Sequence, residues 1–231
     1  MGNRIKVDRI SSLQEVEYFS ALGVSILGFS VGDKIPDGRW IGEHELEAIF
    51  NRFARGPYSL HLDRFHVDLD YFQYINHRFH FPYVQVDYHQ FEIEIIQPSL
   101  KDQQDLICSG IQADHDMEIG WIEAAVREVV SRGAKYCILE VLTDIEDAWA
   151  HLLEAEKYEG EFTVQELLDL SRQYPIMLSL NYARNNIQDV SRMFGQEVFY
   201  HFTLGDISGD PYLKHLVDFQ TALDLVSALR V

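Results

Sequence analysis

The sequence lacks the features that mark secreted, membrane-spanning and nucleic-acid-binding proteins. Only two of its 231 residues are cysteines, and both lie in apolar, strand-like runs, where reduced core cysteines are common. No run of about 18 or more apolar residues occurs, and the N-terminus has no apolar signal region, so we expect a cytoplasmic protein without membrane contact. The formal net charge of −18 argues against nucleic-acid partners, because the phosphate backbone favours basic patches.

Short runs of β-branched and aromatic residues alternate along the chain with stretches of helical periodicity. This alternation is typical of βα units around a parallel sheet. The expected strands are residues 4–8, 25–30, 58–63, 83–87, 106–112, 135–141, 175–180 and 198–203. Eight units in a chain of this length predict a single (βα)8 TIM barrel over residues 1–231, with an open doubly wound sheet as the alternative.

Helix signals fall between the expected strands. Ser12 and Glu15 have the spacing of a capping box. A helix is expected over residues 118–132, because its apolar residues share one side and Gly133 follows it. Residues 144–156 predict an acidic helical insertion after the sixth strand, since acidic residues at its start offset the helix macrodipole.

Several segments resemble phosphoribosylanthranilate isomerases, in the same order along the chain. They are Arg4-Ile5-Lys6-Val7-Asp8-Arg9-Ile10 with residues 21–29, Gly38-Arg39-Trp40-Ile41, Val84-Gln85-Val86, and Leu178-Ser179 with Asn185-Asn186-Ile187. The resemblance implies a (βα)8 barrel enzyme that needs no cofactor, binds a small-molecule substrate and occurs as a monomer or homodimer. It also implies isomerisation of an aminoaldose to an aminoketose, by a base after strand one and an acid after strand six.

The chain departs from this family at the positions that carry its function. Asp8 stands in place of the family's catalytic cysteine, and Glu140 in place of its aspartate. The glycine pair after strand seven is replaced by Leu180-Asn181, and after strand eight only Gly205 remains, before Asp206. Because glycine lets backbone N–H groups approach a phosphate closely, these losses predict a substrate other than phosphoribosylanthranilate.

Asp8 and Glu140 are the predicted catalytic pair. A carboxylate acts as a base at neutral pH when its surroundings raise its pKa. Lys6, two residues earlier on the same strand face, would instead lower the pKa of Asp8. The alternative is that both acids are solvated residues at the edge of a loop.

Four further residues are predicted to bind substrate: Arg39, Asp87, Asn181 and His201. The resemblance implies that Arg39 pairs with a substrate carboxylate, which suits its planar, bidentate guanidinium. A salt bridge with Asp37 or Glu43 is the alternative for this arginine.

Acidic and histidine side chains gather on the predicted inner face at the C-terminal strand ends, where catalytic groups of such barrels converge. Carboxylates that meet there repel one another unless they are protonated, solvated or balanced by a cation. A divalent metal is one such cation, with the candidate ligands His61, Asp63, Asp87, Glu140 and His201, and with His89 and His115 further out. A cationic substrate without metal is another, and a slip of one residue in the strands would remove some of these side chains from the inner face.

Three functions therefore compete. The leading hypothesis is a diverged relative of phosphoribosylanthranilate isomerase, an isomerase or lyase that acts on a small polar, carboxylate-bearing substrate by proton transfer between Asp8 and Glu140. The second is a metal-dependent barrel enzyme that uses the same ring of Asp, Glu and His side chains. The third is a barrel without catalysis that serves as a binding or scaffold subunit, with the aromatic-rich stretch 65–72 as a contact surface.

Overall fold

Eight parallel strands close into a barrel in this computed structural model, which describes residues 2–31, 39–53, 56–62, 68–90, 104–205 and 216–230. The strands are β1 (Arg4–Asp8), β2 (Ile26–Ser30), β3 (Tyr58–Leu62), β4 (Tyr83–Asp87), β5 (Asp105–Ala113), β6 (Ala134–Val141), β7 (Ile176–Ser179) and β8 (Phe199–Leu204). Each strand pairs with the next, and β1 also pairs with β8. This closure confirms the predicted (βα)8 barrel and excludes the open sheet. A short strand, β9 (Leu216–Val217), extends β8.

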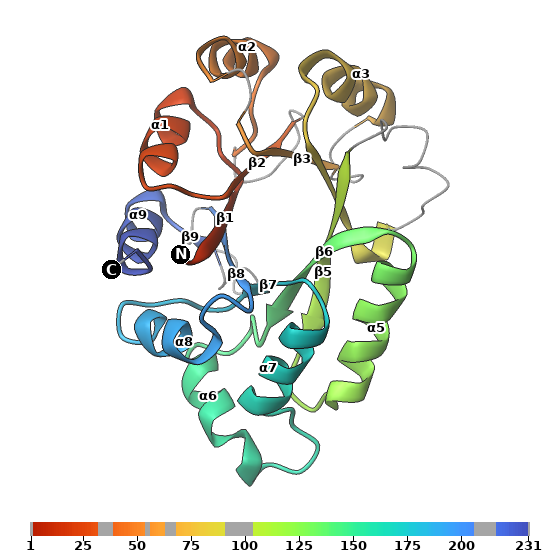
Figure 1. Cartoon of the computed structure of the whole chain (residues 1–231), viewed down its shortest axis with the longest axis vertical. Helices are drawn as coiled ribbons and strands as arrows, with labels where there is room; N and C mark the ends of the chain where they lie inside the picture. Colours follow the sequence, from red (N-terminus) through yellow and green to blue (C-terminus); the bar gives the residue numbers. More distant parts are fainter. Residues whose placement is uncertain are drawn as a thin grey trace.

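Helices surround the barrel on its outside (Figure 1). They are α1 (Leu13–Ala21), α2 (Glu43–Arg52), α3 (Leu69–Phe79), α5 (Ile119–Ser131), α6 (Ala148–Glu154), α7 (Val164–Gln173), α8 (Ile187–Phe194) and α9 (Phe219–Ala228). The helix α5 ends before Gly133, which adopts a positive φ of 99°, as its place after a helix predicts. Within the described ranges, no helix has the length and apolar character needed to cross a bilayer.

The helix α6 lies within the stretch 144–156 and adds a second helix between β6 and β7. Its N-terminus is capped by Asp147, whose side chain accepts a hydrogen bond of 3.0 Å from the backbone N–H of Ala150. The following 3₁₀ turn (Ala155–Lys157) leads through a short loop to α7. Asp147, in the acidic start of this stretch, therefore caps α6.

Apolar side chains fill the barrel interior towards the N-terminal ends of the strands. A separate core cluster consists of Ile26, Ile107, Ile138, Met177 and Phe199. Because residues two apart on a strand share a face, the same face continues from Ile138 to Glu140 and from Phe199 to His201. Burial of each apolar side chain stabilises the fold by about 1.5–3 kcal/mol. The apolar cluster therefore stabilises the interior. The polar residues nearer the C-terminal ends of the strands bring no such gain, so their presence needs another explanation.

Candidate active site

A buried network of charged and polar side chains lies in the barrel interior, between the apolar cluster and the C-terminal ends of the strands. Lys6 and Asp8 lie on the same face of β1, and their side chains form an ion pair that is 0% and 7% exposed, respectively. The Lys6 ammonium also donates a hydrogen bond of 2.6 Å to Oε1 of Gln85 on β4. On β8, Nε2 of His201 lies 2.8 Å from Oδ2 of Asp8. The Asp8 carboxylate thus joins Lys6 and His201 through its two oxygens, and Lys6 extends the network to β4.

Gly28 on β2 leaves the space in which the Asp8 carboxylate sits. A Cβ atom at this position would lie 1.8 Å from Oδ1 of Asp8 and 3.0 Å from Oγ of Ser59. Every larger residue would therefore collide with the carboxylate in its present place. A glycine inside a strand often marks such a close approach, so this signal was available in the sequence.

The network keeps Asp8 ionised. Burial acts to raise the pKa of Asp8, but the Lys6 charge and the His201 imidazole outweigh it and hold that pKa well below its usual range. Burial lowers the pKa of His201, and the Asp8 charge opposes that shift only in part. His201 is therefore neutral at physiological pH, and Asp8 is a weak base while Lys6 remains in contact.

A second histidine–carboxylate pair lies nearer the mouth of the barrel, at the C-terminal ends of the strands. Nε2 of His61 on β3 is 3.1 Å from Oδ1 of Asp87 on β4, and the Ser109 hydroxyl donates to the same oxygen at 2.7 Å. Burial acts to raise the pKa of Asp87, but His61 and Ser109 lower it overall. Asp87 therefore contributes a negative charge to the mouth.

Glu140 on β6 differs from the other acids. Burial, followed by repulsion from Asp87, raises the pKa of Glu140 from 4.5 to about 7. Within the part of the chain that the structure describes, no side chain forms an ion pair or hydrogen bond with its carboxyl group. A carboxylic acid that is half protonated near neutral pH both donates and accepts protons, which is the property that general acid–base catalysis requires.

Arg39 is held next to the first βα loop. Its Nη2 lies 2.6 Å from Oε1 of Glu15 on α1, and its Nε donates to the backbone oxygen of Arg9 at 3.2 Å. Its partner is therefore Glu15 and not Glu43, which contacts Arg78, whereas Asp37 lies outside the described residues. Only half of the expected capping box forms at α1: the Ser12 hydroxyl accepts from the Glu15 N–H, and Oε2 of Glu15 accepts from the N–H of Ser11 instead of that of Ser12.

Asn181 connects two loops at the mouth. Its Nδ2 donates a hydrogen bond of 2.6 Å to the backbone oxygen of Ile145, which ties the loop after β7 to the loop after β6. Its Oδ1 is shielded from solvent and accepts no hydrogen bond from the described residues. The amide nitrogen of Asn181 thus holds the two loops together, so a hydrogen bond to a substrate would have to use its Oδ1.

Three of the residues predicted to hold a metal lie in two separate pairs, and Glu140 lies in neither pair. His61 contacts Asp87 and His201 contacts Asp8, whereas Asp63 lies outside the described residues. Over the described ranges, one group of at least three His, Cys, Asp or Glu side chains brings its ligand atoms within 4.8 Å of one another, and it is a different group: His115, Asp116 and Glu161. Of these, only His115 was among the predicted outer ligands.

Comparison with known proteins supports the fold. No protein-family model matches the chain, and no curated protein matches it by sequence. Among solved structures, phosphoribosylanthranilate isomerase from Thermococcus kodakaraensis is similar with a TM-score of 0.65, 12% identity and 98% coverage of each chain. The isomerase from Pyrococcus furiosus gives a TM-score of 0.62 and 13% identity, covering 98% of this chain and 99% of the other.

A second type of barrel enzyme is about equally similar. Type I 3-dehydroquinate dehydratase from Clostridium difficile gives a TM-score of 0.60 and 12% identity, covering 99% of this chain and 93% of the other. At such low identity these likenesses establish a barrel fold like that of the isomerases, and they establish no reaction.

Proposed function

We propose that this barrel is an isomerase or lyase that acts on a small polar, carboxylate-bearing substrate by proton transfer. The observation that carries the proposal is the pKa of about 7 for Glu140, caused first by burial and then by Asp87. In such a reaction one group removes a proton from a carbon next to a carbonyl or imine, and a proton is returned to a neighbouring atom. Glu140 suits either step because both of its protonation states are populated at neutral pH.

Asp8 is the second carboxylate of the proposed mechanism. Its ion pair with Lys6 and its contact with His201 fix its position and keep it negatively charged. In this state it would accept a proton only from a strongly acidified carbon, or would stabilise positive charge that develops on the substrate. Displacement of the Lys6 ammonium towards a substrate oxygen would raise the pKa of Asp8 and make it a better base.

A carboxylate on the substrate is supported by two observations. Arg39 provides a guanidinium near the end of β1, where a substrate carboxylate would compete with Glu15. Two similar solved structures hold carboxylic acids: reduced 1-(o-carboxyphenylamino)-1-deoxyribulose 5-phosphate in an isomerase and comenic acid, covalently attached, in the dehydratase.

Solvent deuterium exchange tests the proposed proton transfer. The protein is incubated in deuterated buffer with small ketoses, aldoses and amino sugars that carry a carboxylate, and incorporation of deuterium at carbon is followed by NMR. We expect at least one such compound to exchange, and Glu140→Gln and Asp8→Asn each to slow the exchange by about 100-fold or more. Exchange that continues unchanged in both variants, as in the exposed control Glu159→Gln, would contradict the assigned roles.

Metal-dependent chemistry is the second candidate, favoured by the group of His115, Asp116 and Glu161. Imidazole and carboxylate ligands suit Zn²⁺ and Mn²⁺, and the group lies in the loops that follow β5 and precede α7. Elemental analysis of protein purified without added metal separates the two candidates. Stoichiometric metal, together with loss of exchange after treatment with a chelator, would favour the metal-dependent enzyme.

A further inference from the structure

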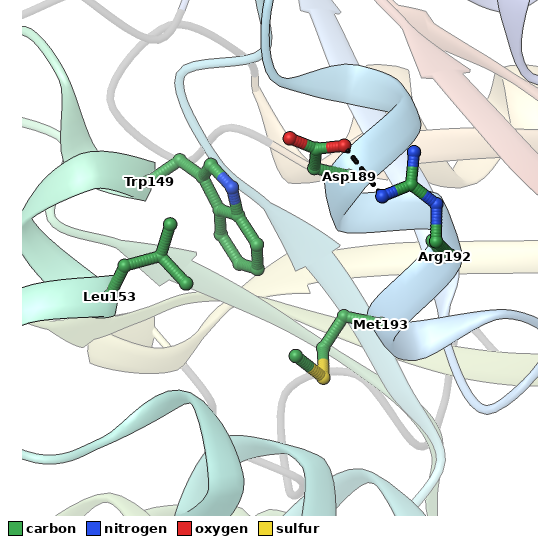
Figure 2. A pocket seen from close by; sticks show the side chains of 5 residues that line it. All are labelled: Trp149, Leu153, Asp189, Arg192 and Met193. Carbon is green, nitrogen blue, oxygen red and sulfur yellow. Dashed lines mark ion pairs between the residues drawn. The ribbon is translucent and has the colours of Figure 1, made fainter.

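A pocket lies outside the barrel, between α6 and α8, and contains none of the residues of the candidate active site. Its volume is about 370 Å³, and it is lined by Trp149, Leu153, Asp189, Arg192 and Met193. Figure 2 shows the indole of Trp149 between Leu153 and the side chains of α8. Pockets of roughly this size accommodate small organic molecules.

The helix α6 contributes the apolar Trp149 and Leu153, and α8 contributes the apolar Met193 together with the charged Asp189 and Arg192. Leu153 and Met193 expose 58% and 42% of their surface, whereas Trp149 is 5% exposed. Asp189 and Arg192 form an ion pair of 3.0 Å at the edge of the pocket.

Trp149 has a buried polar atom without a partner in the part of the chain that the structure describes. Its Nε1 is shielded from solvent and has no hydrogen-bond acceptor among the described residues. Buried indole N–H groups normally have a partner. In Figure 2 the indole nitrogen lies on the side of the ring towards α8, and a ligand oxygen that reached it there would give this donor a partner.

We propose that this pocket binds a free α-amino acid with an apolar side chain. The ligand carboxylate would accept from Nε1 of Trp149 and pair with Arg192, while its ammonium group would pair with Asp189. The apolar side chain would then pack against Trp149, Leu153 and Met193.

The charges of the pocket disfavour the simpler ligands. A plain anion would meet Asp189 and the negative field of the protein, and a plain cation would be repelled by Arg192 and leave Nε1 of Trp149 without an acceptor. A zwitterion exchanges the existing ion pair for two new ones, so neither charge of the protein loses its partner.

Calorimetric titration of the full chain with L-leucine, L-methionine and L-phenylalanine tests the proposal. Saturable binding of at least one of them is expected. Binding should weaken about tenfold or more for N-acetyl-L-leucine, which lacks the ammonium group, for L-leucinamide, which lacks the carboxylate, and for glycine, which lacks the side chain. Absence of saturable binding of all three amino acids, or equal binding of the N-acetyl compound, would overturn the proposal.

Matched variants locate the site. Asp189→Asn should weaken binding about tenfold. Asp169→Asn is the matched control, because Asp169 forms an equivalent ion pair of 3.0 Å with Arg172 on α7, and it should leave binding unchanged because Asp169 does not line the pocket. Trp149→Phe keeps an aromatic ring but removes Nε1, and should also weaken binding. Equal effects of Asp189→Asn and Asp169→Asn would place the binding elsewhere and overturn the assignment.

Discussion

Replacement of Lys6 by methionine is expected to destabilise the protein by about 3–5 kcal/mol, because it leaves a buried carboxylate without its cation. The Lys6 side chain is completely buried against Asp8 and Gln85. Methionine preserves most of its apolar volume, so the loss reflects charge and not a cavity. Urea denaturation at pH 7 measures the change in the free energy of unfolding.

Two comparisons separate this effect from general damage. Addition of Asp8→Asn to the Lys6→Met variant should recover most of the lost stability, because the unbalanced charge is then removed as well. Lys135→Met breaks an ion pair with Asp105 at the surface, where the two side chains are 48% and 35% exposed, and should cost about 1 kcal/mol or less. If Lys6→Met lowered the free energy of unfolding by no more than Lys135→Met does, the buried ion pair would contribute no more to stability than a pair at the surface.

Glu140→Gln is expected to stabilise the protein by about 3 kcal/mol at pH 8 and to impair catalysis. Because the folded pKa of about 7 exceeds the ordinary value of 4.5, the folded protein holds a proton that the unfolded chain releases between these values. Stability therefore falls as the pH rises from about 4.5 through 7, and the penalty is complete above pH 7. Glutamine carries no charge, so the variant escapes that penalty.

Denaturation at pH 4.5 and pH 8 checks the sign. The free energies of unfolding of Glu140→Gln and of the wild type should be similar at pH 4.5, where Glu140 is protonated in the folded protein, and should differ clearly at pH 8. The exposed control Glu159→Gln should differ from the wild type by less than about 0.5 kcal/mol at both values. A variant that is less stable than the wild type at pH 8 would mean that the ionised Glu140 is stabilised by contacts that the structure does not contain.

The strand positions were predictable from the sequence because the alternation of strand and helix is regular. The predicted strands 4–8 and 83–87 coincide with β1 and β4, and the other six differ by one residue at one or both ends. A local signal also predicted the end of α5, since a glycine that ends a helix acts over only a few positions.

The contacts within the site were less predictable. Alternation along β1 places Lys6 and Asp8 on one face, but it does not show that His201 reaches Asp8 while Asp87 turns to His61. Those contacts depend on the stagger of separate strands around the closed barrel. The pairing of Arg39 with Glu15 likewise joins a loop to a helix 24 residues earlier in the chain, which no local pattern specifies.

The most direct test of the proposed acid–base function is a titration of the Glu140 carboxyl group by carbon-13 NMR, assigned with the Glu140→Gln variant. We predict a midpoint near pH 7 for Glu140, with Asp8 still ionised well below pH 4, because burial and Asp87 act on the first and Lys6 on the second. A midpoint near 4.5 for Glu140 would show an ordinary solvated acid, and would contradict its assignment as the proton-transferring group.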